Sequence, residues 1–466
     1  MTTSPAPDHT PTHHTGAISE EGYHKDLGRR HVQMIAIGGA IGTGLFLGAG
    51  SRLQMAGPSL AIIYAVCGVF SFLILRALGE LVMYRPTSGS FVTYAREFLG
   101  ERAAYMAGWL SFLNWAMTGI VDITAVALYM HYWAVFLPVP QWAFALVALA
   151  IVGTMNMIGV RYFGEMEFWF SLIKVVALAL FLVAGALILG IRMPVAGHTT
   201  GNGGSFPHGL FSALMLLQGV VFAYSGIELL GTAAGECEDA REILPRAINS
   251  VIWRIALFYV GSVILLVCLL PWTEYHAGIS PFVTFFQALG IPGIGTIMNI
   301  VVLTAALSSL NSGLYSTGRV LRALALGGSG PKALGKLNKS SVPYVGILTT
   351  LAVYLVGVML NYLIPSRVFE IVLNFSALGI ISTWGFILLC QLRLRAAINR
   401  GDIMPTGFNM PGAPYTTWAT LGFLGFVLVM MAFDYPDGTI TIGAIPLIGA
   451  VLIGGWCLLD RTRRHG

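Results

Sequence analysis

Long apolar segments recur along the chain from about residue 31 to residue 460, separated by short polar connections. A helix that crosses a bilayer needs about 20 mostly apolar residues. Twelve segments meet that requirement, at approximate positions 31–51, 58–83, 102–133, 141–160, 168–191, 208–234, 249–273, 294–323, 344–364, 369–393, 414–433 and 440–460. No large soluble domain fits between them. The pattern therefore predicts an all-α integral membrane protein with twelve transmembrane helices.

Charge is scarce along the chain and unevenly distributed. Charged residues make up 10% of the sequence, whereas about 25% is usual in soluble domains. The net charge of +5 alone would suit an anionic partner such as nucleic acid. However, most Lys and Arg residues fall on one side of the twelve-helix arrangement, the bias that cytoplasmic loops carry. We therefore expect the lipid bilayer as a partner, no nucleic acid, and both termini in the cytoplasm.

The two ends of the chain are polar. Residues 1–30 are rich in Pro, Thr and His and predict a disordered cytoplasmic tail rather than a signal peptide. The predicted membrane domain occupies residues 31–460, and residues 461–466 form a short cytoplasmic tail.

Recognisable catalytic motifs are missing from the sequence. The five cysteines form no CxxC pair and lie mostly in apolar segments, so neither a disulfide nor a metal site is expected. No phosphate-binding loop or nucleophile–base pair is evident. These observations disfavour an enzyme and ATP-driven transport, and they predict no cofactor, no catalytic residue and no metal ligand.

Two of the apolar segments contain residues that interrupt helices. The first holds GGAIGTGLF, in which Gly38, Gly39, Gly42 and Gly44 fall near the middle of the predicted membrane helix. One interpretation is close helix packing, because small residues let backbones approach in lipid. Segment 208–234 is interrupted as well, by Ser225 and Gly226. Interrupted segments at corresponding positions of two halves are typical of transporters whose site is formed by broken helices.

Broken helices expose backbone groups to a ligand. Unwound backbone in the first segment would offer N–H groups, and unwound backbone in the sixth would offer carbonyl groups. Each half-helix end adds about half an elementary charge. Donors on one side and acceptors on the other suit a zwitterion, with its carboxylate at the first segment and its ammonium at the sixth. The pattern predicts an amino-acid-like substrate.

Two charged residues lie inside these apolar segments. An ionised side chain in the bilayer costs on the order of 3 kcal/mol on insertion scales and is usually functional. Lys174 lies six residues into segment 168–191, roughly 9 Å along a helix, so its side chain could alternatively extend to the interface. Glu228 could serve in transport or could cap the interrupted backbone.

A polar stripe runs along segment 102–133. Asn114, Thr118 and Asp122 recur every four residues and therefore share one helix face. One interpretation is hydrogen bonding between helices. The other is selection of a substrate side chain, since a carboxamide needs an acceptor for its NH₂ and a donor for its C=O. Asp122 would be the acceptor and Asn114 or Thr118 the donor, although an acidic Asp122 would also suit a cationic substrate.

A second set of charges stands at the end of segment 208–234. Glu236 and Glu238 lie near Arg241 and Arg246 in the sequence. The spacing predicts an ion pair in a gate or loop.

Several long stretches of the sequence are similar to those of a known protein family. The stretches that carry the resemblance are GGAIGTGLF, Ala56–Gly100, GTAAGE, PRAINSVIWRI and Val301–Ala325. The sequence resembles bacterial amino acid permeases of the amino acid–polyamine–organocation superfamily. The resemblance extends from about Glu21 to Asp460. It implies a 5+5 inverted repeat with broken helices 1 and 6 plus two extra helices, in the bacterial plasma membrane. It also implies import of an amino acid by proton symport with alternating access and no obligatory protein partner.

Parts of the sequence resemble one branch of that family. Four stretches are most similar to the members that transport L-asparagine, namely EEGYHKDLG, Phe112–Trp133, Gly153–Lys174 and SPFVTFF. The resemblance therefore implies L-asparagine as substrate.

The resemblance also implies roles for individual residues. Backbone groups of Ile41, Gly42, Thr43 and Gly44 would bind the substrate carboxylate, and carbonyls around Phe222, Ala223 and Ser225 would bind the ammonium. Phe222 matches an aromatic residue that covers the substrate, a position where some relatives have Trp. Lys174 and Glu228 match the positions associated with proton coupling.

Several alternatives stay open at this point. The substrate could be another amino acid, such as GABA or a cationic or aromatic one, or the protein could exchange amino acids. A sodium-coupled carrier is disfavoured by the lysine at position 174, and an amino acid sensor by the lack of a soluble signalling domain.

Overall fold

The computed structural model describes residues 29–39, 41–192, 204–237, 240–365 and 367–465. Within those ranges the chain forms helices and short turns, without a β-strand. Nine helical stretches of this described part are long and apolar enough to cross a membrane. The expectation of an all-helical protein with multiple membrane-spanning segments is therefore confirmed.

The first part of the chain contains the helices α1 to α8. Their bounds are α1 (Arg29–Gly38), α2 (Thr43–Phe46), α3 (Gly48–Ala56), α4 (Leu60–Tyr84), α5 (Ser90–Leu99), α6 (Glu101–Met130), α7 (Gln141–Ile158) and α8 (Val160–Arg192). The chain turns between α3 and α4 at Gly57, whose φ of 56° lies in the left-handed region that favours glycine.

The second part contains the helices α10 to α21. Their bounds are α10 (Gly209–Met215), α11 (Leu217–Ala223), α12 (Leu229–Ala233), α13 (Ala240–Arg254), α14 (Ser262–Leu269), α15 (Pro281–Ala288), α16 (Ile294–Leu326), α17 (Tyr344–Leu363), α18 (Val368–Arg400), α19 (Tyr415–Met431), α20 (Asp437–Gly443) and α21 (Ile445–His465). A 3-10 turn, η3 (Ala234–Glu236), follows α12, and a π-helical turn, η4 (Ile255–Gly261), joins α13 to α14.

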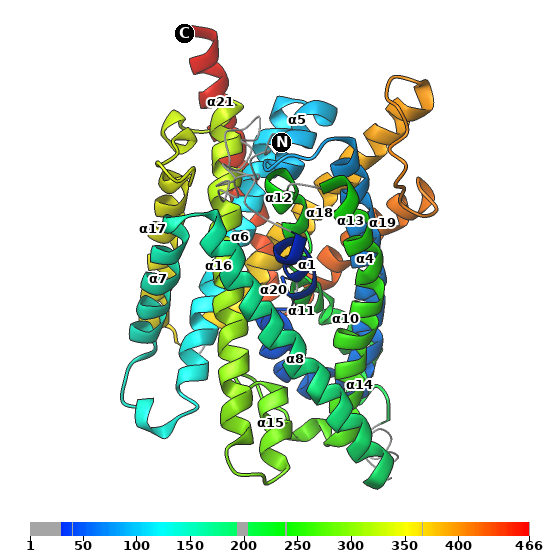
Figure 1. Cartoon of the computed structure of the whole chain (residues 1–466), viewed down its shortest axis with the longest axis vertical. Helices are drawn as coiled ribbons and strands as arrows, with labels where there is room; N and C mark the ends of the chain where they lie inside the picture. Colours follow the sequence, from blue (N-terminus) through cyan, green and yellow to red (C-terminus); the bar gives the residue numbers. More distant parts are fainter. Residues whose placement is uncertain (1–28, 40, 193–203, 238–239, 366, 466) are drawn as a thin grey trace, which may run out of the picture.

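The centre of the molecule is formed by α6, which packs against α16 and α18. In its most apolar window, 78% of the residues of α6 are buried. Figure 1 shows α16 beside α6 in the middle, α7 and α17 on one flank, and α4 and α13 on the other. A helix enclosed on all sides can place polar side chains away from lipid, and α6 carries the Asn114–Thr118–Asp122 stripe.

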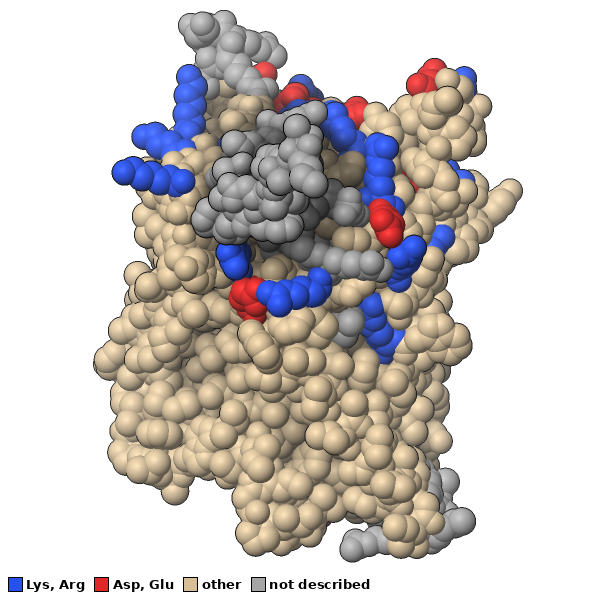
Figure 2. Space-filling view, viewed as in Figure 1, with Lys and Arg blue, Asp and Glu red and all other residues tan. Residues whose placement is uncertain are grey.

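The outer helices expose apolar side chains. Leu180, Val183 and Leu187 of α8 are about three-fifths exposed, and no residue in the apolar window of α21 is buried. On the face drawn in Figure 2, charged side chains lie in the upper half, and no charged side chain is seen on the described surface below them. An uncharged apolar belt of this kind is what lipid contact requires.

Both predicted interruptions are present in the backbone. Between α1 and α2, helical structure stops after Gly38 and resumes at Thr43. Between α11 and α12, it stops after Ala223 and resumes at Leu229, and Gly226 between them has a φ of 90°. The glycines therefore mark places where the helices end rather than only surfaces where helices pack.

The helix that carries Lys174 is longer than the sequence pattern predicts. It begins at Val160 rather than near residue 168. Lys174 therefore lies fourteen residues from the start of α8, about 21 Å along the helix axis. Its side chain is 1% exposed, so the hypothesis that it extends to the membrane interface is wrong.

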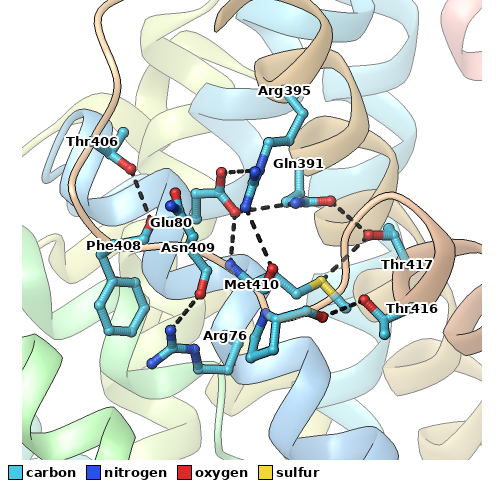
Figure 3. Close-up of polar contacts among 11 residues, drawn as sticks. Arg76, Glu80, Gln391, Arg395, Thr406, Phe408, Asn409, Met410, Thr416 and Thr417 are labelled. Carbon is cyan, nitrogen blue, oxygen red and sulfur yellow. Dashed lines mark hydrogen bonds and ion pairs between the residues drawn. The ribbon is translucent and has the colours of Figure 1, made fainter. Parts of the chain in front are cut away.

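The connection between α18 and α19 is fixed against α4 (Figure 3). The Met410 N–H donates to Glu80 Oε2 at 3.1 Å, and Gln391 Nε2 of α18 donates to the same oxygen at 3.1 Å. Arg395 of α18 forms an ion pair with Glu80. Glu80 is fully buried, and its carboxylate therefore joins α4, α18 and the connecting segment.

A second contact holds the same connection to α4. The Arg76 guanidinium lies over the Phe408 ring, 3.9 Å from its centroid, and donates to the Asn409 carbonyl (Figure 3). Arg76 also donates to Asn249 of α13. The segment thus connects α4 and α13 to α18.

Candidate functional site

The first interruption presents backbone N–H groups. Gly42 is the N-cap of α2, and its carbonyl accepts from Phe46 N at 3.2 Å. The N–H groups of Gly42, Thr43 and Gly44 have no acceptor among the described residues, which do not include Ala40. Ile41 differs, because its N–H donates to the Gly38 carbonyl at 3.0 Å. Within the described part of the chain, the donors without a backbone acceptor are therefore at Gly42–Gly44.

The second interruption presents carbonyl groups. Tight turns occupy part of it, with Tyr224 N donating to Val221 O at 3.0 Å and Ser225 N to Phe222 O at 2.9 Å. Among the described residues, no backbone N–H donates to the carbonyls of Ala223 and Ser225. Within the described residues, the carbonyls without a backbone donor in this segment are therefore those of Ala223 and Ser225.

The two interruptions touch each other. A Cβ added at Gly44 would lie 2.5 Å from Ala223 Cα and 3.0 Å from the Phe222 ring, so α2 and α11 meet backbone to backbone. A Cβ at Gly42 would have more room, 3.6 Å from Ser309 Oγ of α16. Gly42 and Ser225 are only partly buried, whereas Thr43 and Phe222 are 1% exposed. The segment that carries the donors therefore contacts the segment that carries the acceptors, and Gly42 is the glycine where a side chain would fit without a clash.

Asp122 connects the central helix to the first interruption. Its Oδ1 accepts from Thr43 Oγ1 at 2.9 Å, and Ser309 lies within hydrogen-bonding reach of the same carboxylate. Asp122 is fully buried. An acidic group therefore stands directly beside the N-terminus of α2, where it could accept a hydrogen bond from a ligand.

Asn114 and Thr118 lie on the same face of α6 but have partners of their own. Asn114 Oδ1 accepts from Thr118 Oγ1 at 3.3 Å and from Ser376 Oγ of α18 at 3.1 Å. The hydroxyls of Thr118 and Ser376 are 2.6 Å apart. In this conformation these two residues take part in contacts between helices, the interpretation that competed with a binding role.

Glu228 is tied to two helices from the second interruption. Its Oε1 accepts from Asn114 Nδ2 and its Oε2 from Trp384 Nε1, each at 3.4 Å. It is 1% exposed. The carboxylate thus holds the start of α12 to α6 and α18.

Lys174 of α8 contacts the first interruption at the last residue of α1. Its Nζ donates to the Gly38 carbonyl, the last of α1, at 2.7 Å, and to Ser308 Oγ of α16 at 2.9 Å. Glu167, a buried carboxylate that the sequence analysis missed, lies 4.0 Å from the same nitrogen. The charge of Lys174 is therefore linked directly to the end of α1.

Aromatic stacking supports the second interruption. The Tyr224 ring stacks on Tyr259 of η4, with centroids 4.6 Å apart and an interplanar angle of 19°. The Tyr224 hydroxyl donates to the Tyr64 carbonyl of α4 at 2.8 Å. A π-helical turn, a feature often found at functional sites, thus faces the interruption.

One end of the molecule is closed by a buried ion pair. Glu236 of η3 pairs with Arg319 of α16, and the Arg319 guanidinium lies 3.4 Å from the Tyr315 ring centroid. Tyr315 stacks on Phe163 at 3.8 Å. Glu236 therefore forms an ion pair, as expected from the sequence, but its partner is Arg319 rather than the neighbouring Arg241 or Arg246. Glu238 lies outside the described residues.

The opposite end carries a second charged cluster. Arg52 of α3 is 3.6 Å from the Glu370 carboxylate of α18, and Gln218 donates to Asp434 Oδ2 at 2.8 Å. Burial raises the pKa of Asp434, which lies between α19 and α20. With charged contacts at both ends, the central residues are shielded from bulk water.

Two hollows in the molecule differ from this site. A small cavity of 20 Å³ lies behind the interruptions, beside Ile41, Tyr224 and Gly226, and has room for about one water molecule. A larger groove of 460 Å³ runs between α7 and α17, and leucines dominate its lining. Its one hydroxyl, of Thr154, already donates to Ala150 O at 2.7 Å. The cavity is too small for an amino acid, and the side chains that line the groove lack the donors and acceptors that an amino acid needs.

Comparison with known proteins gives consistent results. A family model described as amino acid permease matches residues 31–464. The L-asparagine permease of Salmonella typhimurium is 67% identical over 462 residues, which cover 98% of this chain and 93% of the relative. The L-asparagine permease of Escherichia coli is 69% identical over 443 residues, 94% of this chain and 89% of the relative. L-asparagine permease 1 of Mycobacterium tuberculosis is 58% identical over 453 residues, 96% and 93% respectively.

Proposed function

The chain belongs to the amino acid permease family, whose members are multi-pass membrane transporters rather than enzymes, and we propose that it imports L-asparagine by proton symport. The observation that carries the proposal is the contact between α2 and α11 at the two interruptions, where N–H groups and carbonyls without a backbone partner among the described residues lie close together. The high identity to L-asparagine permeases supports the choice of substrate.

The helices form twelve membrane spans. The first consists of α1–α3, the sixth of α10–α12, the seventh of α13–α14 and the twelfth of α20–α21. The other eight are α4, α6, α7, α8, α16, α17, α18 and α19. Spans 1–5 and 6–10 are the two halves of an inverted repeat, and residues 31–460 form one transport domain. Both tails face the cytoplasm of a bacterium, in agreement with the charge bias of the loops.

The backbone of the two interruptions binds the amino acid itself. The substrate carboxylate accepts hydrogen bonds from the N–H groups of Gly42, Thr43 and Gly44, and the ammonium donates to carbonyls of Phe222, Ala223 and Ser225. Hydrogen bonds to charged groups contribute about 1.5–3 kcal/mol each. Ile41 borders this position, while its own N–H stays bonded to Gly38.

The side chain of L-asparagine points toward α6. Asp122 accepts from the carboxamide NH₂, and the Thr43 hydroxyl that now donates to Asp122 is free to turn toward the carboxamide oxygen. Asn114 and Thr118 shape this region through their contacts with Glu228 and Ser376. A site that pairs both carboxamide groups discriminates strongly against substrates that lack one.

Proton coupling depends on Lys174 and Glu228. Protonated Lys174 donates charge-assisted hydrogen bonds to the Gly38 carbonyl and to Ser308, and these weaken when the amine is neutral. Loss of the proton therefore loosens α1 from α8 and α16. Glu228 holds the start of α12 to α6 and α18, and its protonation would weaken that contact in the same way.

Alternating access follows from the two closed ends. The Glu236–Arg319 pair closes the end that we assign to the cytoplasm, and the Arg52–Glu370 contact closes the other. Spans 1, 2, 6 and 7 move together against the remaining helices, and each movement separates one of these pairs.

The substrate assignment is tested by competition. Proteoliposomes take up radiolabelled L-asparagine in the presence of unlabelled L-asparagine, L-glutamine, L-aspartate, L-lysine or GABA. We expect inhibition by L-asparagine and little by L-lysine. Uptake that L-lysine or GABA inhibits more strongly than L-asparagine would leave the permease family intact but overturn the substrate.

A further inference from the structure

Glu167 is a buried carboxylate to which the transport scheme above gives no role. It lies on α8, seven residues before Lys174, and is fully buried. Its Oε1 accepts from Ser308 Oγ at 2.7 Å and from Ser171 Oγ at 3.2 Å, and its buried Oε2 has no hydrogen-bond partner. A charged group in this position needs an explanation, because burial of an ion is costly.

Ser308 connects Glu167 to Lys174. The hydroxyl lies 2.9 Å from Lys174 Nζ and 2.7 Å from Glu167 Oε1, whereas the two charged groups are 4.0 Å apart. A hydroxyl can accept one hydrogen bond while donating another. It therefore accepts from the lysine and donates to the glutamate, the arrangement that a proton transfer between them requires.

The transfer balances without any further group. An N–H bond of the lysine ammonium breaks as an O–H bond forms on Ser308 Oγ, and the original Ser308 O–H bond breaks as one forms on Glu167 Oε1. The products are a neutral amine and a neutral carboxylic acid. Because the pair starts and ends without net charge, the step leaves no isolated ion in the protein interior.

Glu167 lies on the cytoplasmic side of Lys174. Seven residues of helix correspond to roughly 10 Å toward the start of α8. Glu165, two residues farther, is about one-third exposed and pairs with Arg30 and His31. In Figure 2 the charged side chains gather at one end of the molecule. Although the charged groups of Lys174 and Glu167 are only 4.0 Å apart, transfer to Glu167 moves the proton to the residue that lies nearer to the partly exposed Glu165.

Helix α1 covers the pair in this conformation. A Cβ at Gly38 would lie only 2.1 Å from Ser171 Oγ, so α1 and α8 are in direct contact there. His31 of the same helix lies beside Glu165. Beyond Glu167, the Phe163–Tyr315 stack and the Glu236–Arg319 pair block the path. Movement of α1 away from α8 would expose Glu167 to water.

We propose that Glu167 is the proton release group, which takes the proton of Lys174 through Ser308 and passes it to the cytoplasm when α1 moves. The inference rests on the proposed proton symport. Besides Glu167, the charged group acting on Lys174 is Asp122, on the substrate side. The lysine thus stands between a carboxylate near the substrate and a carboxylate near the cytoplasm.

The test separates net transport from exchange. Proteoliposomes containing wild type or Glu167→Gln are assayed for L-asparagine accumulation driven by a pH gradient, and for exchange of external labelled against internal unlabelled L-asparagine. Exchange returns the carrier with substrate bound and needs no proton release. We expect Glu167→Gln to lower gradient-driven accumulation at least tenfold and to keep exchange within threefold. A pH dye inside the vesicles should show the same loss of asparagine-induced acidification.

A matched control comes from an exposed carboxylate outside the relay. Glu242→Gln removes the partner of Arg246 and should leave both assays within twofold of wild type. If Glu167→Gln is not monodisperse after purification, Ser308→Ala interrupts the bridge while keeping both charges. It should slow accumulation more than exchange.

Three results would overturn the inference or its premise. Accumulation by Glu167→Gln equal to wild type would show that protons leave by another route. Equal loss of accumulation and exchange would show that Glu167 only supports the structure. If wild type itself ignores the pH gradient, the proposed symport fails, and the relay fails with it.

Discussion

A single methyl group at Gly42 tests where the substrate carboxylate binds. In Gly42→Ala the new Cβ would lie 3.6 Å from Ser309 Oγ, an ordinary van der Waals distance. Gly42 has φ −130° and ψ −160°, an extended conformation that alanine adopts readily. The variant should therefore fold with unchanged stability. The methyl group, however, occupies space beside the N–H groups that bind the carboxylate.

The expected loss of affinity follows from the contacts removed. Displacement of the carboxylate breaks one hydrogen bond to a charged group, worth about 1.5–3 kcal/mol. At about 1.4 kcal/mol for each factor of ten, this corresponds to a roughly 10- to 150-fold increase in Kd. The measurement is equilibrium binding of radiolabelled L-asparagine to purified protein, with the melting temperature recorded on the same sample.

The neighbouring glycine provides the control. In Gly44→Ala the Cβ would lie 2.5 Å from Ala223 Cα, too close for the two half-helices to remain in contact. This variant should lower the melting temperature, whereas Gly42→Ala should not. A Gly42→Ala protein that binds L-asparagine with wild-type affinity would refute the location of the carboxylate at the first interruption.

Four further changes have defined expectations. Asp122→Ala should reduce uptake of L-asparagine and weaken its advantage over L-alanine as a competitor; an unchanged ranking in competition assays would remove Asp122 from side-chain recognition. Lys174→Ala should abolish accumulation driven by a pH gradient but keep exchange, and undiminished accumulation would contradict its coupling role. Glu80→Ala removes one partner of a buried ion pair and should cost about 3–5 kcal/mol of stability, measured as a lower melting temperature. The control Glu242→Ala, in an exposed ion pair, should cost no more than about 1 kcal/mol. Burial raises the pKa of Asp434 above 3.8, so this carboxyl stays protonated to a higher pH in the native state than in the unfolded state. Stability therefore falls as pH rises from about 4 through the native pKa. Asp434→Asn should lose this pH dependence of the melting temperature.

The helical fold class and the two interruptions could be predicted from the sequence because each has a strong local sequence pattern. Long apolar stretches have few structural alternatives in a membrane. Glycines in the first segment and Ser225–Gly226 in the sixth break the helical pattern where the backbone indeed leaves the helix. Local composition also separated these two segments from the uninterrupted ones.

The residue at which α8 begins could not be predicted from the sequence in this way. Arg161, Glu165 and Glu167 make the beginning of this helix polar, and the hydropathy pattern therefore places its start near residue 168. In the structure these residues are helical because α8 packs against α1 and α16. That tertiary contact buries Glu167 beside Lys174, and no local pattern indicates it.

Long-range pairings were the other difficulty. Glu236 stands close in sequence to Arg241 and Arg246 but pairs with Arg319, 83 residues away. Asp122 bonds to Thr43, 79 residues earlier. Partners at such separations are set by how the helices pack, and the sequence identifies the candidates without identifying the pairs.

The most direct test of the central claim is uptake of radiolabelled L-asparagine into proteoliposomes whose interior is more alkaline than the medium, without sodium. The account predicts accumulation above equilibrium that disappears when an ionophore collapses the pH gradient. Uptake that reaches the same level with or without the gradient would contradict proton symport.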